Sequence, residues 1–234
     1  MNVFIVHAHP EPKSFTSAMK NLAVETLTAM GHKIVVSDLY EMGFNPVSGP
    51  GDFRERRDAD YLSYALEQRH GYRSGTLAPD VAEEVAKLVA ADFLLLSFPV
   101  YWFSVPAILK GWIDRTFLSG LCFGGRRFYD RGGLKGRRAM IAFSTGGQEH
   151  MFTETGVHGP VERMLSHIEQ GSLAYVGMEV LPHFAAWHVP FVSEERRRKM
   201  LEEYRQHLLD LETLTPKKYR SLDEFDDNLR PLAP

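Results

Sequence analysis

Three aromatic side chains in succession, Tyr101, Trp102 and Phe103, follow an apolar run at residues 93–98. Such a run, interrupted only by Ser97, is typical of a strand buried on both faces of a parallel sheet. Ligands of open α/β proteins bind beyond the carboxyl ends of such strands. Aromatic rings at this place favour a flat, conjugated ligand. The alternative is that the rings belong to the core and only happen to fall near a loop.

A second candidate site lies between an apolar run at 3–6, which predicts a first buried strand, and a predicted helix from Ser14 to about Met30. Ser14 is a suitable N-cap, and a helix that starts directly after a strand offers free N–H groups and partial positive charge to a phosphate. The hydroxyl groups of Thr16 and Ser17 add donors. Because the glycine fingerprint of dinucleotide-binding folds and the P-loop lysine are both missing, we do not expect nucleotide hydrolysis.

The pair His7 and His9 would project from the same side of a strand, as two metal ligands do. Three interpretations are open: metal ligands, phosphate partners, or loop histidines bonded to the backbone. A metal is the least favoured, because no nearby carboxylate or cysteine completes a four-ligand set at typical spacing.

A glycine-rich segment at 120–133 carries Cys122, Phe123, Phe128 and Tyr129. Flexible backbone with aromatic side chains suits the wall of a site for an aromatic substrate. Cys122 lies between apolar neighbours with no basic side chain next to it, which favours a packed small hydrophobe over a reactive thiol.

The triplet Thr145, Gly146 and Gly147 follows a predicted strand at 138–144. A hydroxyl and two glycines at the carboxyl end of a strand let backbone N–H groups approach the edge of a ligand. Alone the triplet is a weak signal, but next to the aromatic loop of a neighbouring strand it is much stronger.

Strands and helices alternate along the rest of the chain. Further strands are predicted at 33–37, near an edge, and at 178–181, with 183–189 extending the sheet or packing at a subunit contact. Further helices are predicted at 79–90, from an N-cap at Ser104 to Phe117, at 160–171, and at 194–214 with Ser193 as cap and Pro216 as terminator. The excursion 48–78 is expected to hold one helix at about 58–69 and to act as lid or interface.

This alternation predicts one α/β domain over residues 1–215, followed by an extended tail at 216–234. The expected architecture is a doubly wound, five-stranded parallel sheet of the flavodoxin-like order 2-1-3-4-5.

Composition excludes several classes of protein. A formal charge of −3 provides no net attraction to nucleic acid or anionic membranes. One cysteine forms no intramolecular disulfide, and neither a signal peptide nor an apolar run of about 20 residues is present, so we expect a cytoplasmic protein with no transmembrane segment.

The motif FPxxWFxVPAILKGWxDRxF at residues 98–117 closely resembles the family of flavin-dependent NAD(P)H:quinone oxidoreductases. The likeness covers residues 3 to about 225 and is strongest at 8–15, 93–117 and 144–159. It implies a homodimer with FAD, or FMN, contacted by both subunits, and two-electron ping-pong transfer from NADH or NADPH to a quinone or similar flat acceptor.

The resemblance also implies residue roles. The flavin would contact His9, Ser14, Phe15, Thr16, Pro99, Val100, Tyr101, Trp102, Phe103, Thr145, Gly146, Gly147 and, at the adenosine end, Arg197. The substrate pocket would be lined by Phe123, Gly125, Phe128, Phe152, His158 and Tyr175, the last from the partner subunit. The implied catalytic positions are His158, Trp102 and Phe103, and no metal is implied.

Several positions differ from the mammalian family members. Phe152 replaces a tyrosine and cannot donate a hydrogen bond, so His158 acts alone or the role is dispensable. Tyr101 replaces a glutamine and Gly125 a gating tyrosine, which with Phe128 and Phe152 indicates a more open pocket, while Thr16 replaces an asparagine with a shorter hydrogen-bonding side chain. Without the resemblance, His158 would be interpreted as a core histidine bonded to backbone.

A second class of function is a regulatory flavoprotein, like the ancillary subunits of bacterial potassium efflux systems, with weak turnover and a partner-binding surface. The length of the chain, the excursion 48–78 and the tail favour the dimeric reductases. The residues do not distinguish quinone, azo and nitro acceptors.

Overall fold

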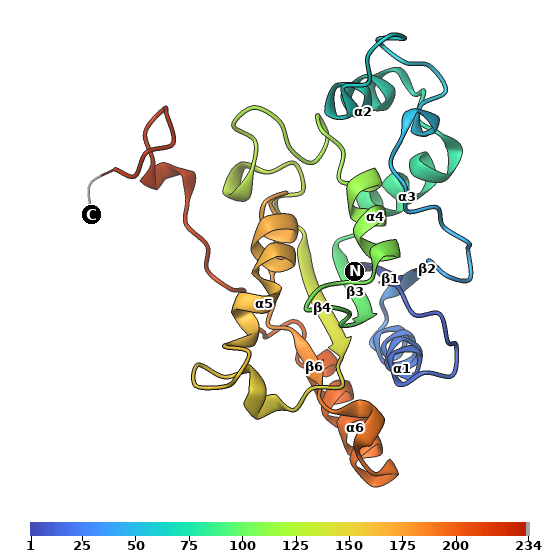
Figure 1. Ribbon diagram of the computed structural model, residues 1–234, viewed down its shortest axis with the longest axis vertical. Helices are drawn as coiled ribbons and strands as arrows, with labels where there is room; N and C mark the ends of the chain where they lie inside the picture. The colour runs from blue at the N-terminus through green and yellow to red at the C-terminus, as the bar shows by residue number, and fades with distance from the viewer. Residues whose placement is uncertain (233–234) are drawn as a thin grey trace.

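The computed structural model describes residues 1–232, and within them six strands form one parallel sheet in the order β2-β1-β3-β4-β5, with β6 also paired to β4 (Figure 1). The strands are β1 (Asn2–His7), β2 (Lys33–Asp38), β3 (Phe93–Pro99), β4 (Arg138–Ser144), β5 (Glu179–Val180) and β6 (Phe184–Ala186). The predicted sheet and strand order are confirmed. One detail differs: β5 pairs with the start of β4 and β6 with its end, because Pro182 between them has no N–H to continue the ladder.

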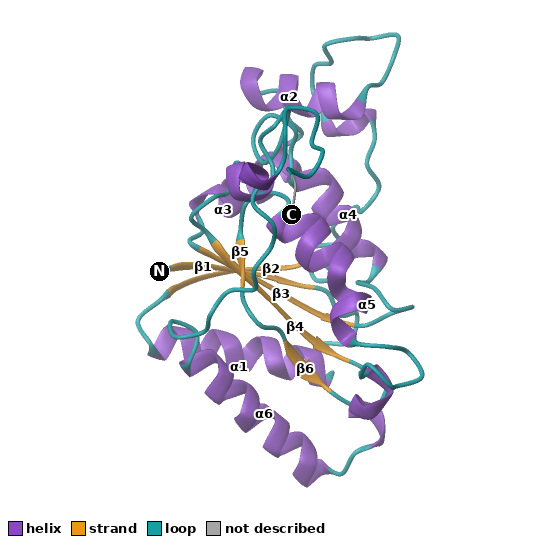
Figure 2. Ribbon diagram, turned by 90° about the vertical axis from the view of Figure 1, so that its left-hand side faces the viewer, coloured by secondary structure: helices purple, strands orange, loops and turns teal. Residues whose placement is uncertain are grey.

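Helices cover both faces of the sheet, with α1 and α6 on one side and α3, α4 and α5 on the other (Figure 2). They are α1 (Phe15–Ala29), α2 (Tyr64–Ser74), α3 (Pro79–Ala90), α4 (Ala107–Thr116), α5 (Val161–Ile168) and α6 (Glu194–Leu209). A π-helical segment, η4 (Glu169–Ala174), continues α5, and short 3₁₀ turns are η1 (Pro50–Asp52), η2 (Tyr129–Arg131), η3 (Glu149–Phe152), η5 (Val189–Phe191) and η6 (Leu222–Glu224). None of the helices described is long and apolar enough to cross a membrane.

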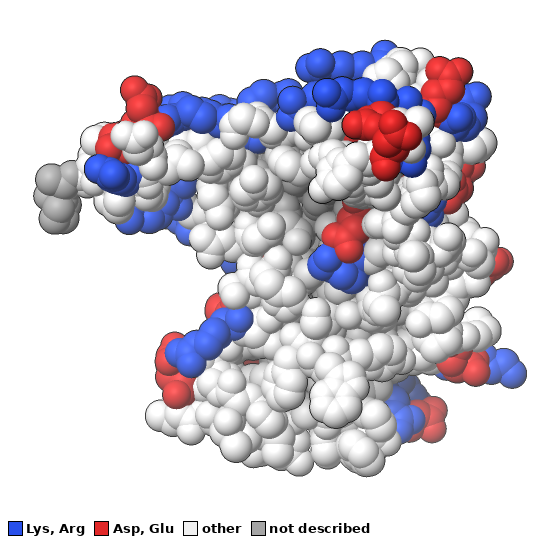
Figure 3. Space-filling view, turned by 45° about the horizontal axis from the view of Figure 1, so that its top comes forward, with Lys and Arg blue, Asp and Glu red and all other residues white. Residues whose placement is uncertain are grey.

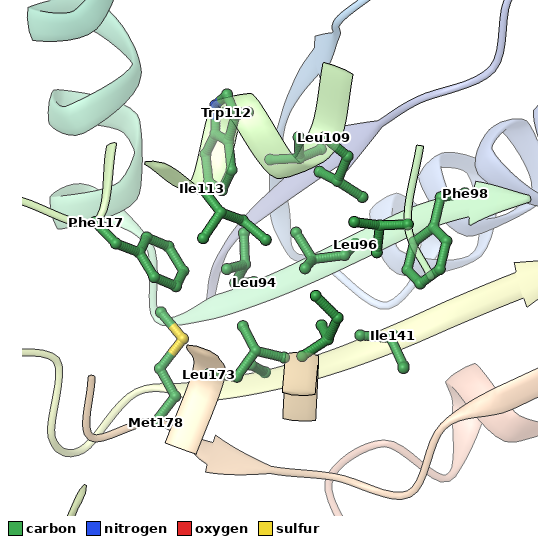
Figure 4. Packing of buried hydrophobic residues seen from close by; sticks show 14 of the residues in the cluster. Leu94, Leu96, Phe98, Leu109, Trp112, Ile113, Phe117, Ile141, Leu173 and Met178 are labelled. Atoms are coloured by element: carbon green, nitrogen blue, oxygen red, sulfur yellow. The ribbon is translucent and has the colours of Figure 1, made fainter. Parts of the chain in front are cut away.

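Strand β3 lies at the centre of the sheet, and all of its residues are buried. Leu94, Leu96 and Phe98 point toward α4, where Leu109 and Trp112 meet them (Figure 4). The alternate residues pack on the other face against α1 and α6. Because burying a leucine or phenylalanine side chain contributes about 1.5–3 kcal/mol, both faces of this strand stabilise the domain.

A buried ion pair between Arg115 and Asp52 ties the excursion 48–78 to α4. Arg115, only 3% exposed, donates from Nε and Nη2 to Oδ1 of Asp52 at 3.0 and 2.8 Å. Its Nη1 donates to the Asn45 carbonyl at 2.8 Å, and Asp80 lies 2.8 Å from its Nη2. An ion pair without access to water depends on such complete hydrogen bonding, so Arg115 fixes where the excursion begins.

Five predicted helix boundaries were wrong. Ser104 does not cap α4, which begins at Ala107 after Pro106, because Ser104 instead closes a tight turn with Tyr101. Helix α2 starts at Tyr64 rather than near residue 58, since the Asp58 carboxylate accepts two backbone N–H bonds and forms a turn, and it ends at Ser74 rather than near residue 69, where the left-handed Gly75 caps it. Helix α6 stops at Leu209, so Pro216 does not end it, and the helix from Val161 runs past Gly171 through the π-helical segment.

The tail at 216–232 lies beside the glycine-rich loop, as the red and yellow-green segments of Figure 1 show. Ser221 and the Leu222 N–H both bond to the carboxylate of Asp130. The tail is not simply extended, since it contains η6 and an antiparallel bridge between Phe225 and Pro231. The last predicted tail residues, 233 and 234, lie outside the described part of the chain.

Candidate active site

The carboxyl ends of β1, β3 and β4 meet at one edge of the sheet, and their loops are hydrogen-bonded to each other. The hydroxyl oxygens of Thr16 and Ser144 lie 2.7 Å apart, joining the start of α1 to the end of β4. The Val100 N–H donates to the Ser144 carbonyl at 2.8 Å, joining the loop after β3 to the same residue. These bonds bring Pro99 and Val100 beside the loop that joins β1 to the N-terminus of α1.

The segment after β6 completes this edge. Arg197 on α6 donates from Nε to the Val189 carbonyl at 3.3 Å, and the Val189 N–H donates to the Thr145 carbonyl at 3.1 Å. Arg197, which the resemblance assigns to the adenosine end of FAD, is therefore linked through one residue to the Thr145–Gly147 triplet.

The N-terminus of α1 has the expected anion-binding geometry. Ser14 is the N-cap and accepts the Ser17 N–H at 3.1 Å. The N–H groups of Phe15 and Thr16 donate to no acceptor in residues 1–232, and an anion at the helix start can receive them. The Phe15 ring itself packs against the core between α1 and α6.

The two histidines of the His7-x-His9 pair have different surroundings. His7 is fully buried, with Nδ1 3.1 Å from Ser97 Oγ and Nε2 3.1 Å from Ser17 Oγ, and burial lowers its pKa to about 4. His9 is partly exposed, accepts the Glu11 N–H at 3.0 Å, and its pKa is also lowered by partial burial. In residues 1–232 no three His, Cys, Asp or Glu side chains gather as a metal site would require.

The aromatic loop is a tight turn with unusual backbone angles. Tyr101 and Ser104 exchange both backbone hydrogen bonds at 3.0 Å, and φ is +51° at Trp102 and +60° at Phe103. Turns of this kind favour Asn-Gly, because bulky residues adopt positive φ at a cost. The side chain of Trp102 is 96% exposed, so the interpretation of these rings as core residues is wrong.

Phe103 belongs to a first aromatic cluster at the site. Its ring centroid lies 5.0 Å from that of His158 and 6.2 Å from that of Phe152, and His158 and Phe152 are 4.9 Å apart. Gly147 is required here, since a Cβ at this position would come within 2.6 Å of the Phe152 ring. The glycine triplet, the aromatic turn and His158 therefore lie together and form one open surface at the carboxyl edge of the sheet.

The other predicted substrate residues form a second aromatic cluster elsewhere. Tyr175 stacks on Phe128 at 5.4 Å and lies 5.8 Å from Phe123, while Gly125 is exposed in the same loop. His158 precedes α5 and Tyr175 follows η4, roughly 20 Å apart at the rise of a helix, and their loops lie at opposite ends of α5 in Figure 1. One chain alone therefore does not place all six residues around one pocket.

Cys122 is fully buried in the core, and burial raises the pKa of its thiol to about 12. The prediction of a packed small hydrophobe fits this environment, because a thiol with so high a pKa supplies little thiolate.

Comparison with known proteins agrees with this architecture. The family model described as flavodoxin-like fold matches residues 1–208. The chain belongs to the flavodoxin-like fold family. The ribosyldihydronicotinamide dehydrogenase [quinone] of Mus musculus is 41% identical over 207 residues, covering 88% of this chain and 90% of its own length. The NAD(P)H dehydrogenase [quinone] 1 of Rattus norvegicus is 36% identical over 227 residues, covering 97% and 83%.

Solved structures give the same assignment. A putative quinone reductase from Klebsiella pneumoniae superposes with a TM-score of 0.94 at 30% identity, covering 99% of this chain and 93% of that one. The NAD(P)H:quinone oxidoreductase of Methanothermobacter marburgensis gives 0.70 at 26% identity, covering 94% and 98%.

Two further residues of this flavodoxin-like site were not predicted. Trp187 packs 5.2 Å from Phe152, and His188 bonds to the backbone of the glycine triplet. The only sequence signal was that 183–189 is too apolar for a surface loop, which correctly indicated an extension of the sheet. Nothing in the sequence pointed to His188.

His7 predicts a pH dependence of stability. Its pKa is about 4 in the folded protein against 6.5 for free histidine, so its neutral form favours folding above pH 6.5. Since one pKa unit corresponds to about 1.36 kcal/mol, the shift of the His7 pKa contributes about 3 kcal/mol to the free energy of unfolding. This contribution is lost as the pH falls from 6.5 toward 4. His7→Leu should flatten the free energy of unfolding over this window in urea titrations, and an unchanged slope would show that His7 is not the group responsible.

Substitutions in the aromatic turn should have opposite effects on the stability of the protein and on its affinity for FAD. Replacing Trp102→Asn together with Phe103→Gly restores the preferred turn residues, so we expect the protein without flavin to gain about 1–2 kcal/mol in unfolding free energy. FAD affinity, measured by quenching of flavin fluorescence, should fall at least about tenfold with the loss of both rings. The control Trp102→Ala keeps the backbone cost and should lose affinity without gaining stability. Unchanged FAD affinity in the double variant would exclude this turn from the flavin site.

Proposed function

We propose that this protein holds FAD at the carboxyl edge of its sheet and carries two electrons from a dihydronicotinamide to a quinone. The observation that carries the proposal is the exposed aromatic turn: the Trp102 side chain is 96% exposed, and the half-exposed Phe103 ring lies beside His158. An aromatic surface left in water at a ligand-binding edge favours a flat ring system as its partner. The identity to quinone dehydrogenases over most of the chain supports the same chemistry.

The donors along this edge fit a flavin dinucleotide from end to end. The free N–H groups of Phe15 and Thr16 suit its phosphates. At the ring end, the N–H groups of Trp102, Phe103 and Gly146 bond to no protein acceptor within residues 1–232 and suit the polar atoms of an isoalloxazine. Arg197, which donates to the Val189 carbonyl, is the residue that the family resemblance assigns to the adenosine end, and this assignment favours FAD over FMN.

When bound, FAD supplies the two-electron chemistry by accepting a hydride from the dihydronicotinamide and giving it to the acceptor. The rings of Phe103 and Phe152 both pack against the imidazole of His158 and so fix its position at the edge of the site. His158 is able to hold or give a proton there, whereas Phe152 has no hydroxyl and is not.

The proposed active unit is a homodimer. The face in Figure 3 carries its charged side chains mainly along the upper rim and the edges, while most of its middle is uncharged. A groove of about 640 Å³ between α2, α4 and η4 opens beside Phe123 and Tyr175. Pairing two such faces would bring the second aromatic cluster of one chain to the first cluster of the other, completing the pocket that one chain leaves open.

The redox assignment is tested with purified, FAD-reconstituted protein under anaerobic conditions. NADH, NADPH or ribosyldihydronicotinamide should bleach the visible absorbance of the bound flavin, and a naphthoquinone should restore it. His158→Gln should slow this cycle about 10- to 100-fold while FAD stays bound, whereas the exposed His150→Gln should not. A bound flavin that no donor bleaches would favour the regulatory alternative, and absence of flavin binding would leave only the shared fold.

The shared pocket is tested by mixing two inactive variants. In a dimer of His158→Gln with Tyr175→Ala, one site carries both changes and the other carries neither, provided that each site combines residues from both chains. After random exchange of subunits, about a quarter of wild-type quinone reductase activity should therefore return. If the mixture stays as inactive as its components although light scattering shows dimers, each site is built from one chain.

A further inference from the structure

The glycine triplet is held from behind by two residues of the segment after β6. The Val189 N–H donates to the Thr145 carbonyl at 3.1 Å, and the His188 N–H donates to the Gly147 carbonyl at 2.9 Å. The carbonyl between them, that of Gly146, lies 2.8 Å from Nδ1 of the His188 ring. Three successive carbonyl groups thus have their partners on one side.

This arrangement decides where the N–H groups of the triplet point. Each peptide unit is planar and trans, so its N–H points opposite to its C=O. The N–H groups of Gly146, Gly147 and Gln148 therefore point away from His188, toward the open side of the site. That of Gly147 bonds to Thr145 Oγ1 at 3.2 Å, and those of Gly146 and Gln148 meet no acceptor in residues 1–232.

His188 makes both of its contacts only because its backbone is left-handed, with φ +56° and ψ +28°. This conformation is uncommon for a residue with a side chain, and such residues gather at functional sites. A carbonyl only accepts, so Nδ1 carries the ring proton, and Nε2 is left to accept the Gln148 side-chain amide at 3.4 Å. The ring of Phe191 covers the imidazole at 4.9 Å.

We propose that His188 is a positioning residue for the flavin: it holds the carbonyl groups of the Thr145–Gly147 triplet so that the N–H groups of Gly146 and Gln148 meet the edge of the isoalloxazine. The inference rests on the proposed function. Fixed N–H dipoles favour the form of a ligand that carries more negative charge, which for a flavin is the reduced one. His188 therefore strengthens binding and raises the midpoint potential of the bound flavin.

The test distinguishes the contribution of the His188 ring from that of its left-handed backbone. His188→Gly keeps the left-handed backbone and its N–H but removes the imidazole, so FAD affinity should fall about 3- to 10-fold, the effect of one hydrogen bond. The midpoint potential of the bound flavin should become more negative, while the urea midpoint of the flavin-free protein stays equal or rises. His188→Asn should restore both properties, because the amide nitrogen of Asn takes the place of Nδ1 and Asn tolerates positive φ.

The matched control is Leu229→Gly, which replaces another non-glycine residue of positive φ, at +59°, in the tail. It should leave FAD affinity and potential unchanged. A wild-type potential in His188→Gly, or a shift that Leu229→Gly reproduces, would overturn the role of His188. Wild-type protein that binds no flavin would instead overturn the proposed function on which the inference rests.

Discussion

The parallel pairing of β3 with β1 on one side and β4 on the other is the constraint on which the site depends. Parallel strands end at the same edge, so the loops that follow them converge whatever their sequences are. Burial of both faces of β3 fixes its register, since a shift by one residue would exchange the side chains of the two cores. The bond between Thr16 and Ser144 then joins the outer two of the three loops.

Positive backbone angles at residues other than glycine mark the same edge. Among the five such residues in the described chain, Trp102 and Phe103 form the exposed turn of this edge and His188 holds the glycine triplet, while Tyr129 and Leu229 lie elsewhere. Glycine or asparagine would adopt such angles more readily, so the three larger side chains are held at this edge at a conformational cost. The burial of β3 and the hydrogen bonds between the loops stabilise the fold enough to hold the turn in this conformation.

The separation of the two aromatic clusters follows from the length of α5 and η4. His158 lies before this helix and Tyr175 after it, so a longer or shorter helix would change their distance but not join them. The glycine-rich loop that carries Phe128 is in turn held by the tail, through Asp130. Substrate recognition, as proposed, therefore depends on elements distant from the flavin edge of the same chain.

The sequence by itself determined the sheet order, the flanking helices and which loops meet at the carboxyl edge of the sheet, because apolar periodicity, the Ser14 cap and the family motif are local signals. It did not determine where α2, α4 and α6 begin or end, because Asp58 and Ser104 form turns and the residues after Leu209 leave the helix well before Pro216. Only the tertiary structure separated Phe123 and Phe128 from His158, and revealed His188 behind the triplet. Those outcomes depend on hydrogen bonds and packing between segments distant along the chain, which no local pattern encodes.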